Sequence, residues 1–245
     1  HYPGLNLTIA TLDGLIKYPQ VLNERIGVDG KRNHKGIYET DGSLVASFKS
    51  FSERTFECQI MNWCDDVAYA MHDLEDAIII GTVGLGELTD ENIRDRICIR
   101  ALESYKEEWE FSDSEPLTPR EVLEYVDLIR KECLVTPGRR GADRLAILKS
   151  FMASQINDCI GGVSSVPSGK DQPNRYTQNL QVPTELAKRV ESFKAVTMMC
   201  VIRTPAVITL QHAGKRIVSD LFSVFSGIER LPDGQYKFRF EEDPY

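Results

Sequence analysis

The sequence of 245 residues has no apolar run near the length of about 18 residues that a membrane-spanning helix needs. It also has no surplus of basic residues, because 29 Lys and Arg stand against 37 Asp and Glu and give a net charge of −8. Bulk electrostatics therefore do not indicate nucleic acid or an anionic membrane as a partner. We expect no membrane partner for this chain.

Cysteine pairs with metal-ligand spacing are absent as well. Six Cys occur, and none of them forms a C-x-x-C pair, which argues against a zinc knuckle or a thioredoxin-type motif. Most lie among apolar residues of expected helices, as buried reduced thiols do in the cytosol. These features predict a cytoplasmic protein.

The most informative segment is residues 56–80, which contains no Gly or Pro. Its apolar residues recur three or four positions apart, the pattern of a helix with one apolar face: Ile60, Trp63, Val67, Met71, Leu74 and Ile78. A polar stripe falls on the opposite side within roughly 80° of arc: Asn62, Asp65, Tyr69, Asp73 and Asp76, with His72 at its border.

Two interpretations of this polar stripe are open. It is either a solvated acidic face, which is the usual role of a charge run, or the wall of a ligand site. Carboxylates stacked one turn apart repel each other unless a cation or hydrogen-bond donors lie among them. No Lys or Arg occurs from Asn62 to Asp76. Spacing alone gives the two interpretations equal weight and specifies no reaction.

Two segments resemble one enzyme family. Residues 65–76, DDVAYAMHDLED, resemble the D-D-I-A-Y…H-D-(L/I)-(E/D)-D helix of bacterial dGTPase-like deoxynucleoside triphosphate triphosphohydrolases. Residues 5–19, LNLTIATLDGLIKYP, are similar to that family's L-N-L-T-x-A-T-L-x-G-L-L-K-Y-P segment. The two segments occur in the family's order, whereas the C-terminal half matches only loosely. These enzymes belong to the HD-domain superfamily of metal-dependent phosphohydrolases.

The resemblance assigns roles by position. Asp65 corresponds to the last aspartate ligand of the family's metal site, and so to a catalytic residue. Tyr69 and Asp73 correspond to residues that hold the deoxyribose, with the aspartate at the 3′-hydroxyl. Lys17 and Tyr18 correspond to a segment near the triphosphate.

The implied activity is metal-dependent hydrolysis of deoxynucleoside triphosphates, with dGTP the expected substrate, to a deoxynucleoside and inorganic triphosphate. A divalent ion, Mg²⁺ or Mn²⁺, is expected because it activates water for attack on the α-phosphorus. The resemblance also implies a homo-oligomer. The alternative, a non-catalytic helical module that binds nucleotides or mediates oligomerisation, stays open.

The family's other metal ligands, an upstream His and a His-Asp pair, have no counterpart in the sequence. The pair His72-Asp73 lies inside the later helix. His72 could reach a metal near Asp65, but we expect it to support a metal ligand or to pack as a polar residue. We therefore expect the chain to be the C-terminal part of a longer enzyme, a single domain over residues 1–245.

One carboxylate does not hold a catalytic divalent ion, so we expect the chain alone to retain no metal and to be inactive.

The predicted fold is mainly α, a partial HD-domain-like bundle of several helices, with a small β hairpin or strand near the C-terminus. The strand is indicated by alternating Tyr236, Phe238 and Phe240 after a Pro-Asp-Gly turn. Beside residues 56–80, expected helices cover 7–18, 91–109, 119–134, 139–160, 185–202 and a last stretch from 205 that Gly214 interrupts.

Two stretches are expected to be irregular. Residues 20–50 are Gly-rich and predict a surface excursion with one short hairpin over 36–45. Its basic residues, Lys31, Arg32, His34 and Lys35, suit a solvated loop, a flap over phosphates or a subunit contact. Residues 161–183 are rich in Ser, Gly and Pro and predict a long loop, in which Lys170, Arg175 and Tyr176 stand out.

Overall fold

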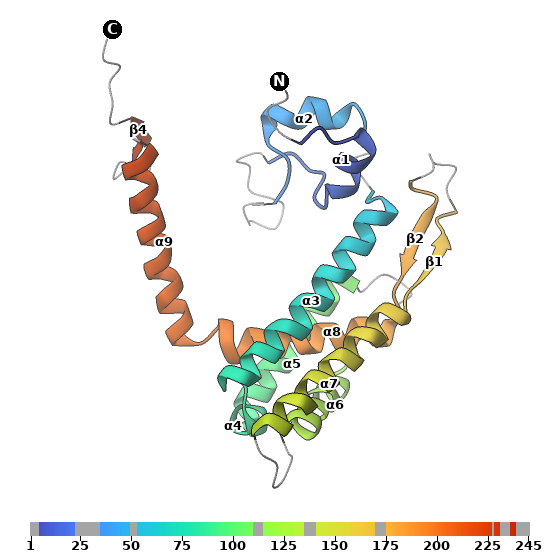
Figure 1. Cartoon of the computed structure of the whole chain (residues 1–245), viewed down its shortest axis with the longest axis vertical. Helices are drawn as coiled ribbons and strands as arrows, with labels where there is room; N and C mark the ends of the chain where they lie inside the picture. The colour runs from blue at the N-terminus through green and yellow to red at the C-terminus, as the bar shows by residue number, and fades with distance from the viewer. Residues whose placement is uncertain are drawn as a thin grey trace.

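The computed structural model describes residues 5–22, 35–49, 53–109, 115–134, 141–169, 175–226, 228–230 and 236–238. Helices dominate these residues, as predicted (Figure 1). The α-helices are α1 Ile9–Leu15, α2 Glu39–Ala46, α3 Phe56–Ile80, α4 Leu85–Thr89, α5 Glu91–Trp109, α6 Pro119–Ile129, α7 Gly141–Gly161, α8 Thr184–Thr197 and α9 Pro205–Ser226. Two π-helical turns, η1 Arg130–Leu134 and η2 Met198–Ile202, extend α6 and α8.

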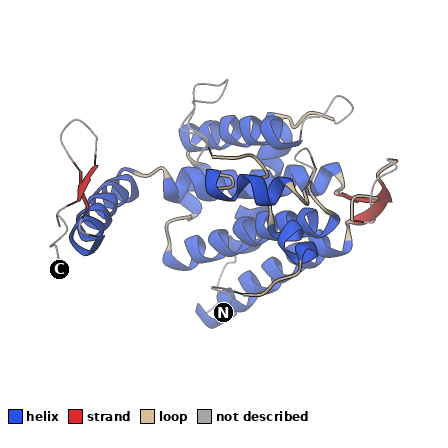
Figure 2. Cartoon of the chain, turned by 90° about the horizontal axis from the view of Figure 1, so that it is seen from above, coloured by secondary structure: helices blue, strands red, loops and turns tan. Residues whose placement is uncertain are grey.

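Helix α8 forms the centre of the body. It packs against α3, α5 and α6, while α7 lies along α3 (Figures 1 and 2). Its Val190, Phe193 and Val196 are fully buried, and Trp63 of α3 stacks edge-on against Trp109 of α5 with ring centroids 5.8 Å apart. Burial of this apolar surface is the main force that holds the helices together.

The long helix α3 begins and ends where its sequence directs. Thr55 is the N-cap, and its Oγ1 accepts a hydrogen bond from the Cys58 amide at 3.2 Å. Gly81, with φ of 84°, ends the helix in the left-handed conformation that favours glycine. The predicted apolar face is largely confirmed, since Trp63, Val67, Met71 and Leu74 are buried. The inward position predicted for Ile60 is wrong, because this residue is 39% exposed.

Two short hairpins complete the chain. Strands β3 Ile228–Arg230 and β4 Tyr236–Phe238 pair antiparallel, which confirms the predicted hairpin near the C-terminus. Strands β1 Ser164–Pro167 and β2 Gln178–Gln181 also pair antiparallel, so the long loop predicted over 161–183 is wrong in these segments. Strand pairing is a non-local property that a Ser- and Gly-rich composition does not reveal.

Other expectations need correction. Residues 39–46 form helix α2, where a hairpin over 36–45 was expected. Helix α1 ends at Leu15, so Lys17 lies beyond it and not in its last turn. Helix α9 runs through Gly214 without a break. Predictions for the following lie outside the described residues: Lys31, Arg32, His34, Arg139, Arg140, Lys170, the 232–234 turn and Phe240.

No single helix among the described residues combines the length and apolar character of a membrane span. Helices α8 and α9 pass that test only as a pair, and they are bent by 75° relative to each other.

Candidate functional site

The segment after α1 is fixed against the first turns of α3. The Arg54 Nε donates a hydrogen bond to the Lys17 carbonyl oxygen at 3.0 Å, and the Cys58 thiol approaches the Ile16 carbonyl oxygen at 3.5 Å. Lys17 then reaches along α3, and its Nζ lies 2.9 Å from Asp65 Oδ2. The fold thus supplies to the acidic stripe a cation that the stripe itself lacks.

These residues border a polar cleft of about 540 Å³, which we call the Lys17 cleft. Its walls come from the end of α1, from α3, and from the ends of α5 and α8. They are Lys17, Tyr18, Lys35, Arg54, Asn62, Asp65, Asp66, Glu107, Glu108 and Lys194. Three of the five predicted site residues, Lys17, Tyr18 and Asp65, therefore meet in one place.

Three cations surround the ring of Tyr18. The Lys35 Nζ lies 5.0 Å from the ring centroid and 3.2 Å from the phenolic oxygen. The Lys17 Nζ lies 5.7 Å and the Arg54 Cζ 5.8 Å from the same centroid. Cations over an aromatic face are attracted by its quadrupole, which offsets part of their mutual repulsion. A polyanion that enters this part of the cleft would offset the remaining repulsion among the three cations.

Burial alone would lower the pKa of Lys17, but its hydrogen bond to Asp65 and the nearby carboxylates raise the pKa overall. Lys17 therefore keeps its positive charge at neutral pH. Its side chain is 22% exposed and that of Asp65 is 71% exposed, so water screens the ion pair strongly. The pair can open at little cost when a ligand offers Lys17 a second anion.

A buried network supports the far wall of the cleft. Glu191 is fully buried and accepts hydrogen bonds from Ser104 Oγ at 2.7 Å, Trp109 Nε1 at 3.2 Å and Lys194 Nζ at 2.7 Å. Lys194 also donates to Asp66 Oδ1 at 3.1 Å. Burial lowers the pKa of Lys194, but Glu191 and Asp66 outweigh it and raise the pKa overall. This network fixes Asp66, the neighbour of Asp65.

Tyr69 and Asp73 lie one and two turns beyond Asp65 on α3, and neither lines the Lys17 cleft. Both are partly buried. Burial, followed by the charge of Asp73, raises the pKa of Tyr69, so its phenol stays protonated. Burial, followed by the charge of Asp76, raises the pKa of Asp73. Their predicted sugar-binding role stays a prediction.

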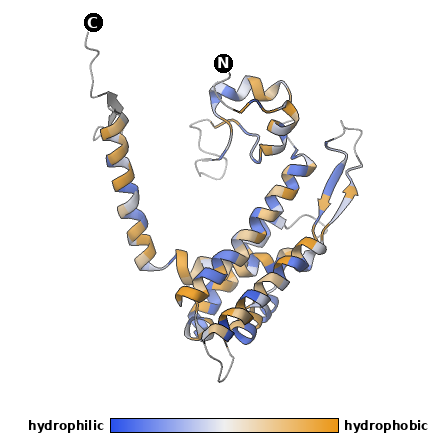
Figure 3. Cartoon of the chain, in the orientation of Figure 1, coloured by the Kyte–Doolittle hydropathy of each residue, from blue (hydrophilic) through white to orange (hydrophobic). Residues whose placement is uncertain are grey.

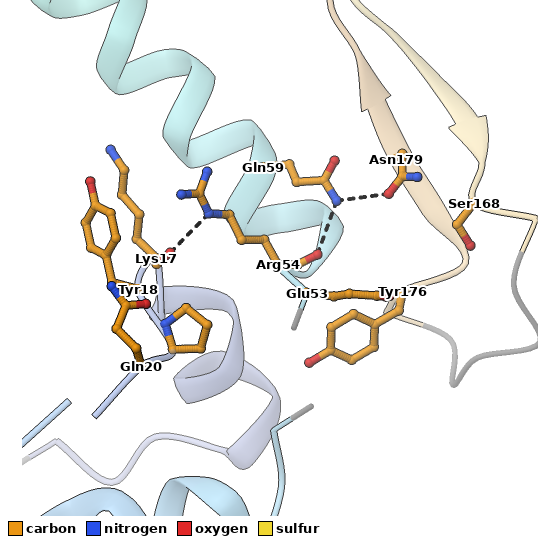
Figure 4. Close-up of a pocket in the computed structure, with 10 residues that line it drawn as sticks. Lys17, Tyr18, Gln20, Glu53, Arg54, Gln59, Ser168, Tyr176 and Asn179 are labelled. Atoms are coloured by element: carbon orange, nitrogen blue, oxygen red, sulfur yellow. Dashed lines mark hydrogen bonds between the residues drawn. The ribbon is translucent and has the colours of Figure 1, made fainter. Parts of the chain in front are cut away.

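A second cleft of about 570 Å³, the hairpin cleft, shares Lys17, Tyr18 and Arg54 with the Lys17 cleft (Figure 4). It separates the end of α1 from the β1–β2 hairpin. Gln59 ties the hairpin to α3, because its amide nitrogen donates to Asn179 Oδ1 at 3.2 Å and its oxygen accepts from the Leu180 amide at 2.8 Å. The remaining walls include Pro19, Gln20, Glu53, Ser168 and Tyr176.

A buried charge cluster anchors α1 below this cleft. Asp13 is 4% exposed and lies 2.7 Å from Lys49 Nζ, and Tyr176 donates to both Asp13 carboxylate oxygens at 2.9 and 2.8 Å. Burial and the hydrogen bond to Asp13 raise the pKa of Tyr176. Arg175 also bonds to the Ala10 carbonyl oxygen and to Glu57. These contacts hold the segment that carries Lys17.

Sequence reasoning missed several of these residues. Arg54 precedes α3 with no motif of its own, and Lys194 lies 128 positions from its partner Asp66. One feature of the sequence marks Asp13, because it is an acidic residue inside the apolar pattern of a short helix. Lys35 was noted only as part of a basic loop.

The described residues do not by themselves fit a divalent metal ion. No three His, Cys, Asp or Glu side chains gather among them closely enough to hold one. Asp65 offers a carboxylate, but it is paired with Lys17, and the adjacent Asp66 is bound to Lys194. Divalent ions take several ligands, so the rest of a coordination sphere would have to come from outside the described residues.

No protein-family model matches the chain. The chain is similar to a deoxyguanosinetriphosphate triphosphohydrolase-like protein of Bifidobacterium longum, with 26% identity over 98% of this chain and 51% of that protein. A protein of the same description from Pasteurella multocida is 24% identical over 93% of this chain and 54% of its own length. Along most of its length the chain is therefore similar to proteins of this dGTPase-like description.

The similarity to these dGTPase-like proteins extends along most of the chain, and one local match is stronger. A third relative, from Corynebacterium diphtheriae, is 42% identical over 91 residues, which are 36% of this chain and 21% of that protein. The chain spans about half the length of the two curated relatives that it matches along most of its own length.

Proposed function

We propose that this chain forms the triphosphate- and sugar-binding part of an enzyme that hydrolyses deoxynucleoside triphosphates to a deoxynucleoside and inorganic triphosphate. The observation that carries the proposal is the cluster of Lys17, Lys35 and Arg54 around Tyr18, beside Asp65. A triphosphate carries several negative charges, and charge-assisted hydrogen bonds from Lys and Arg are the strongest that a protein offers it.

The spacing along α3 suits an extended nucleotide. Asp65, Tyr69 and Asp73 are four residues apart, so Asp73 lies about 12 Å along the helix from Asp65. A triphosphate at the Lys17 cleft would therefore place its sugar near Tyr69 and Asp73. There the protonated Tyr69 phenol can donate a hydrogen bond, and the Asp73 carboxylate can accept one from the 3′-hydroxyl.

Asp65 is proposed as a metal ligand and catalytic residue on the strength of the family resemblance. When bound, Mg²⁺ or Mn²⁺ would supply charge stabilisation and an activated water. The part of the chain that the structure describes lacks the other ligands, so its own contribution is to bind and orient the nucleotide. The names of the relatives favour dGTP as substrate.

Binding tests the proposal before turnover does. Titration calorimetry with a non-hydrolysable dGTP analogue should show saturable binding to the chain. Lys17→Ala should weaken this binding by at least about tenfold, because one charge-assisted contact is worth roughly 1.5–3 kcal/mol. Lys149→Ala is the matched control, since Lys149 is 63% exposed and pairs with Glu75 away from both clefts.

Two results would count against the proposal. The first is no detectable binding of the analogue, and the second is equal loss of affinity in both variants. Binding without triphosphate release, when the part of a relative that this chain does not cover is supplied, would favour the alternative, a module that only binds nucleotides.

A further inference from the structure

Helices α3 and α5 both pack on α8, and their contacts show that they run antiparallel (Figure 1). Trp63 of α3 stacks against Trp109 at the end of α5. Asp66, which comes later in α3, is joined through the Lys–Glu ion pair of α8 to Ser104, which comes earlier in α5. Residues still later in α3 therefore lie level with residues still earlier in α5.

This arrangement places Arg100 of α5 level with the proposed sugar site. Glu107 of α5 and Asp65 of α3 both line the Lys17 cleft. Arg100 precedes Glu107 by seven residues, so it lies on nearly the same face of α5, two turns or about 10 Å away. Tyr69 and Asp73 follow Asp65 by one and two turns. Because the helices are antiparallel, both displacements lead away from the cleft in the same direction.

The polar positions of α3 are spaced for such a track. Figure 3 shows hydrophilic positions that recur along α3 among hydrophobic ones, as in a helix with one polar side. A nucleotide that follows this side of α3 from the Lys17 cleft would have Arg100 of α5 beside it.

Arg100 keeps hydrogen-bond donors that the described fold does not use. Its side chain is 26% exposed, and its Nη1 lies 3.9 Å from Glu103 Oε2, which is too far for a hydrogen bond. Within the described ranges the guanidinium donates no hydrogen bond. A surface ion pair is the usual role of an arginine on a helix, but such a pair does not explain why this largely covered group leaves its donors unused.

The charge of Arg100 also acts on Tyr69. Burial, followed by the charge of Asp73, raises the pKa of Tyr69, and the positive charges of Lys194 and Arg100 oppose that rise. This effect agrees with the position that the antiparallel helices give Arg100. The base of a nucleotide is bonded directly to its sugar, so a sugar beside Tyr69 and Asp73 leaves the base within reach of Arg100.

Guanine and adenine differ at the edge that an arginine contacts best. Guanine presents two acceptors, O6 and N7, which match the two parallel donors of a guanidinium. Adenine presents N7 as an acceptor, but its 6-amino group is a donor and opposes the second guanidinium N–H. An arginine beside the base therefore favours guanine.

We propose that Arg100 donates two hydrogen bonds to O6 and N7 of a bound guanine and so selects dGTP over dATP. The inference rests on the proposed function, since it takes the triphosphate to occupy the Lys17 cleft. It adds a specificity residue that lies outside both family-like segments and lines neither cleft.

Titration calorimetry with non-hydrolysable analogues of dGTP and dATP tests this role. The wild type should prefer the dGTP analogue by about tenfold or more. Arg100→Met should reduce the preference to less than about twofold by weakening the dGTP analogue alone. Arg100→Lys keeps the charge but loses the paired donors, so it should also lose most of the preference. The control is Arg120→Met, because Arg120 is 89% exposed, pairs with Glu124 and lines neither cleft.

Circular dichroism shows whether each variant keeps its helices, and Arg100→Lys decides the question if Arg100→Met fails to fold. Equal weakening of both analogues would overturn the inference, since the arginine would then contact the phosphates or the sugar. An unchanged preference, or a wild type that binds both analogues equally, would overturn it as well. These results leave the proposed function intact, whereas a wild type that binds neither analogue would contradict both.

Discussion

The Lys17 Nζ lies 2.9 Å from Asp65 Oδ2, although 48 positions separate the two residues in the chain. The contact joins the two segments whose sequences resemble one enzyme family. It places a cation and a carboxylate on the wall of one polar cleft. The lysine stabilises anions there, and the carboxylate repels them, so the two side chains have opposite effects on a bound triphosphate.

Asp65→Asn should therefore tighten binding of inorganic triphosphate to the metal-free chain. A unit charge a few ångströms away in water is worth about 1 kcal/mol, or roughly a fivefold change in affinity. Titration calorimetry with a metal chelator in the buffer measures this change. The control is Asp76→Asn, an exposed residue of the same helix outside the cleft, which should leave the affinity unaltered. Weaker binding by Asp65→Asn would argue against phosphates at this position.

Asp73→Ala should remove most of the preference for nucleotides with a 3′-hydroxyl, because it leaves no side-chain oxygen to accept a hydrogen bond from that hydroxyl. The measurement compares affinities for a non-hydrolysable dGTP analogue and its 2′,3′-dideoxy counterpart, and the expected loss of preference is about tenfold. Because the pKa of Asp73 is raised, the carboxylate gains its proton at a higher pH than an ordinary aspartate. The wild-type preference should therefore decline as pH falls through that raised pKa. A preference that Asp73→Ala leaves intact would refute the sugar-binding role.

The elements that the sequence predicts well are those with local signals. Helix α5 has the predicted bounds, and α6 begins at the predicted Pro119, with Thr118 as its N-cap. Helix α2 was missed because Asp41 and Gly42 are turn formers, and the segment has little amphipathic character. The β1–β2 hairpin was missed because part of its support is remote, from the Gln59 side chain of α3.

The candidate site likewise combines residues that the sequence could identify with residues that it could not. Lys17, Tyr18 and Asp65 could be named because they fall in recognisable motifs, and the structure brings them together. Arg54, Lys35 and Lys194 reach the cleft only through tertiary contacts between segments far apart in the chain. A one-dimensional pattern contains no information on such contacts unless a motif marks the residue.

Tyr176→Phe tests the anchor of α1. The substitution keeps the ring near Lys49 but removes both hydrogen bonds to the buried Asp13 carboxylate. The expected loss is about 2 kcal/mol in the free energy of unfolding, measured by urea denaturation. Tyr38→Phe serves as control, because Tyr38 is 71% exposed and the same change there should cost less than about 0.5 kcal/mol. Equal stabilities of the two variants would show that the anchor contributes little.

Lys194→Met tests the network behind Asp66. It would leave the fully buried Glu191 without its cation, at an expected cost of about 3 kcal/mol or more near neutral pH. The raised pKa of Lys194 means that its stabilisation is complete below its ordinary pKa of 10.5 and is lost as pH rises through the raised value. The difference between wild type and variant should therefore narrow only in strongly alkaline solution.

The matched control is Lys131→Met, whose lysine is 80% exposed and pairs at the surface with Glu132, itself 45% exposed. Its expected cost is below about 1 kcal/mol. If the stability difference between wild type and Lys194→Met were already lost before the rising pH reached 10, that result would be inconsistent with the raised pKa of Lys194.

A crystal structure of the chain with a non-hydrolysable dGTP analogue tests the central claim most directly. The account predicts triphosphate oxygens within hydrogen-bond distance of Lys17, Lys35 and Arg54, with the sugar beside Tyr69 and Asp73. A nucleotide bound in the hairpin cleft alone, or elsewhere on the surface with the Lys17–Asp65 pair intact, would contradict it.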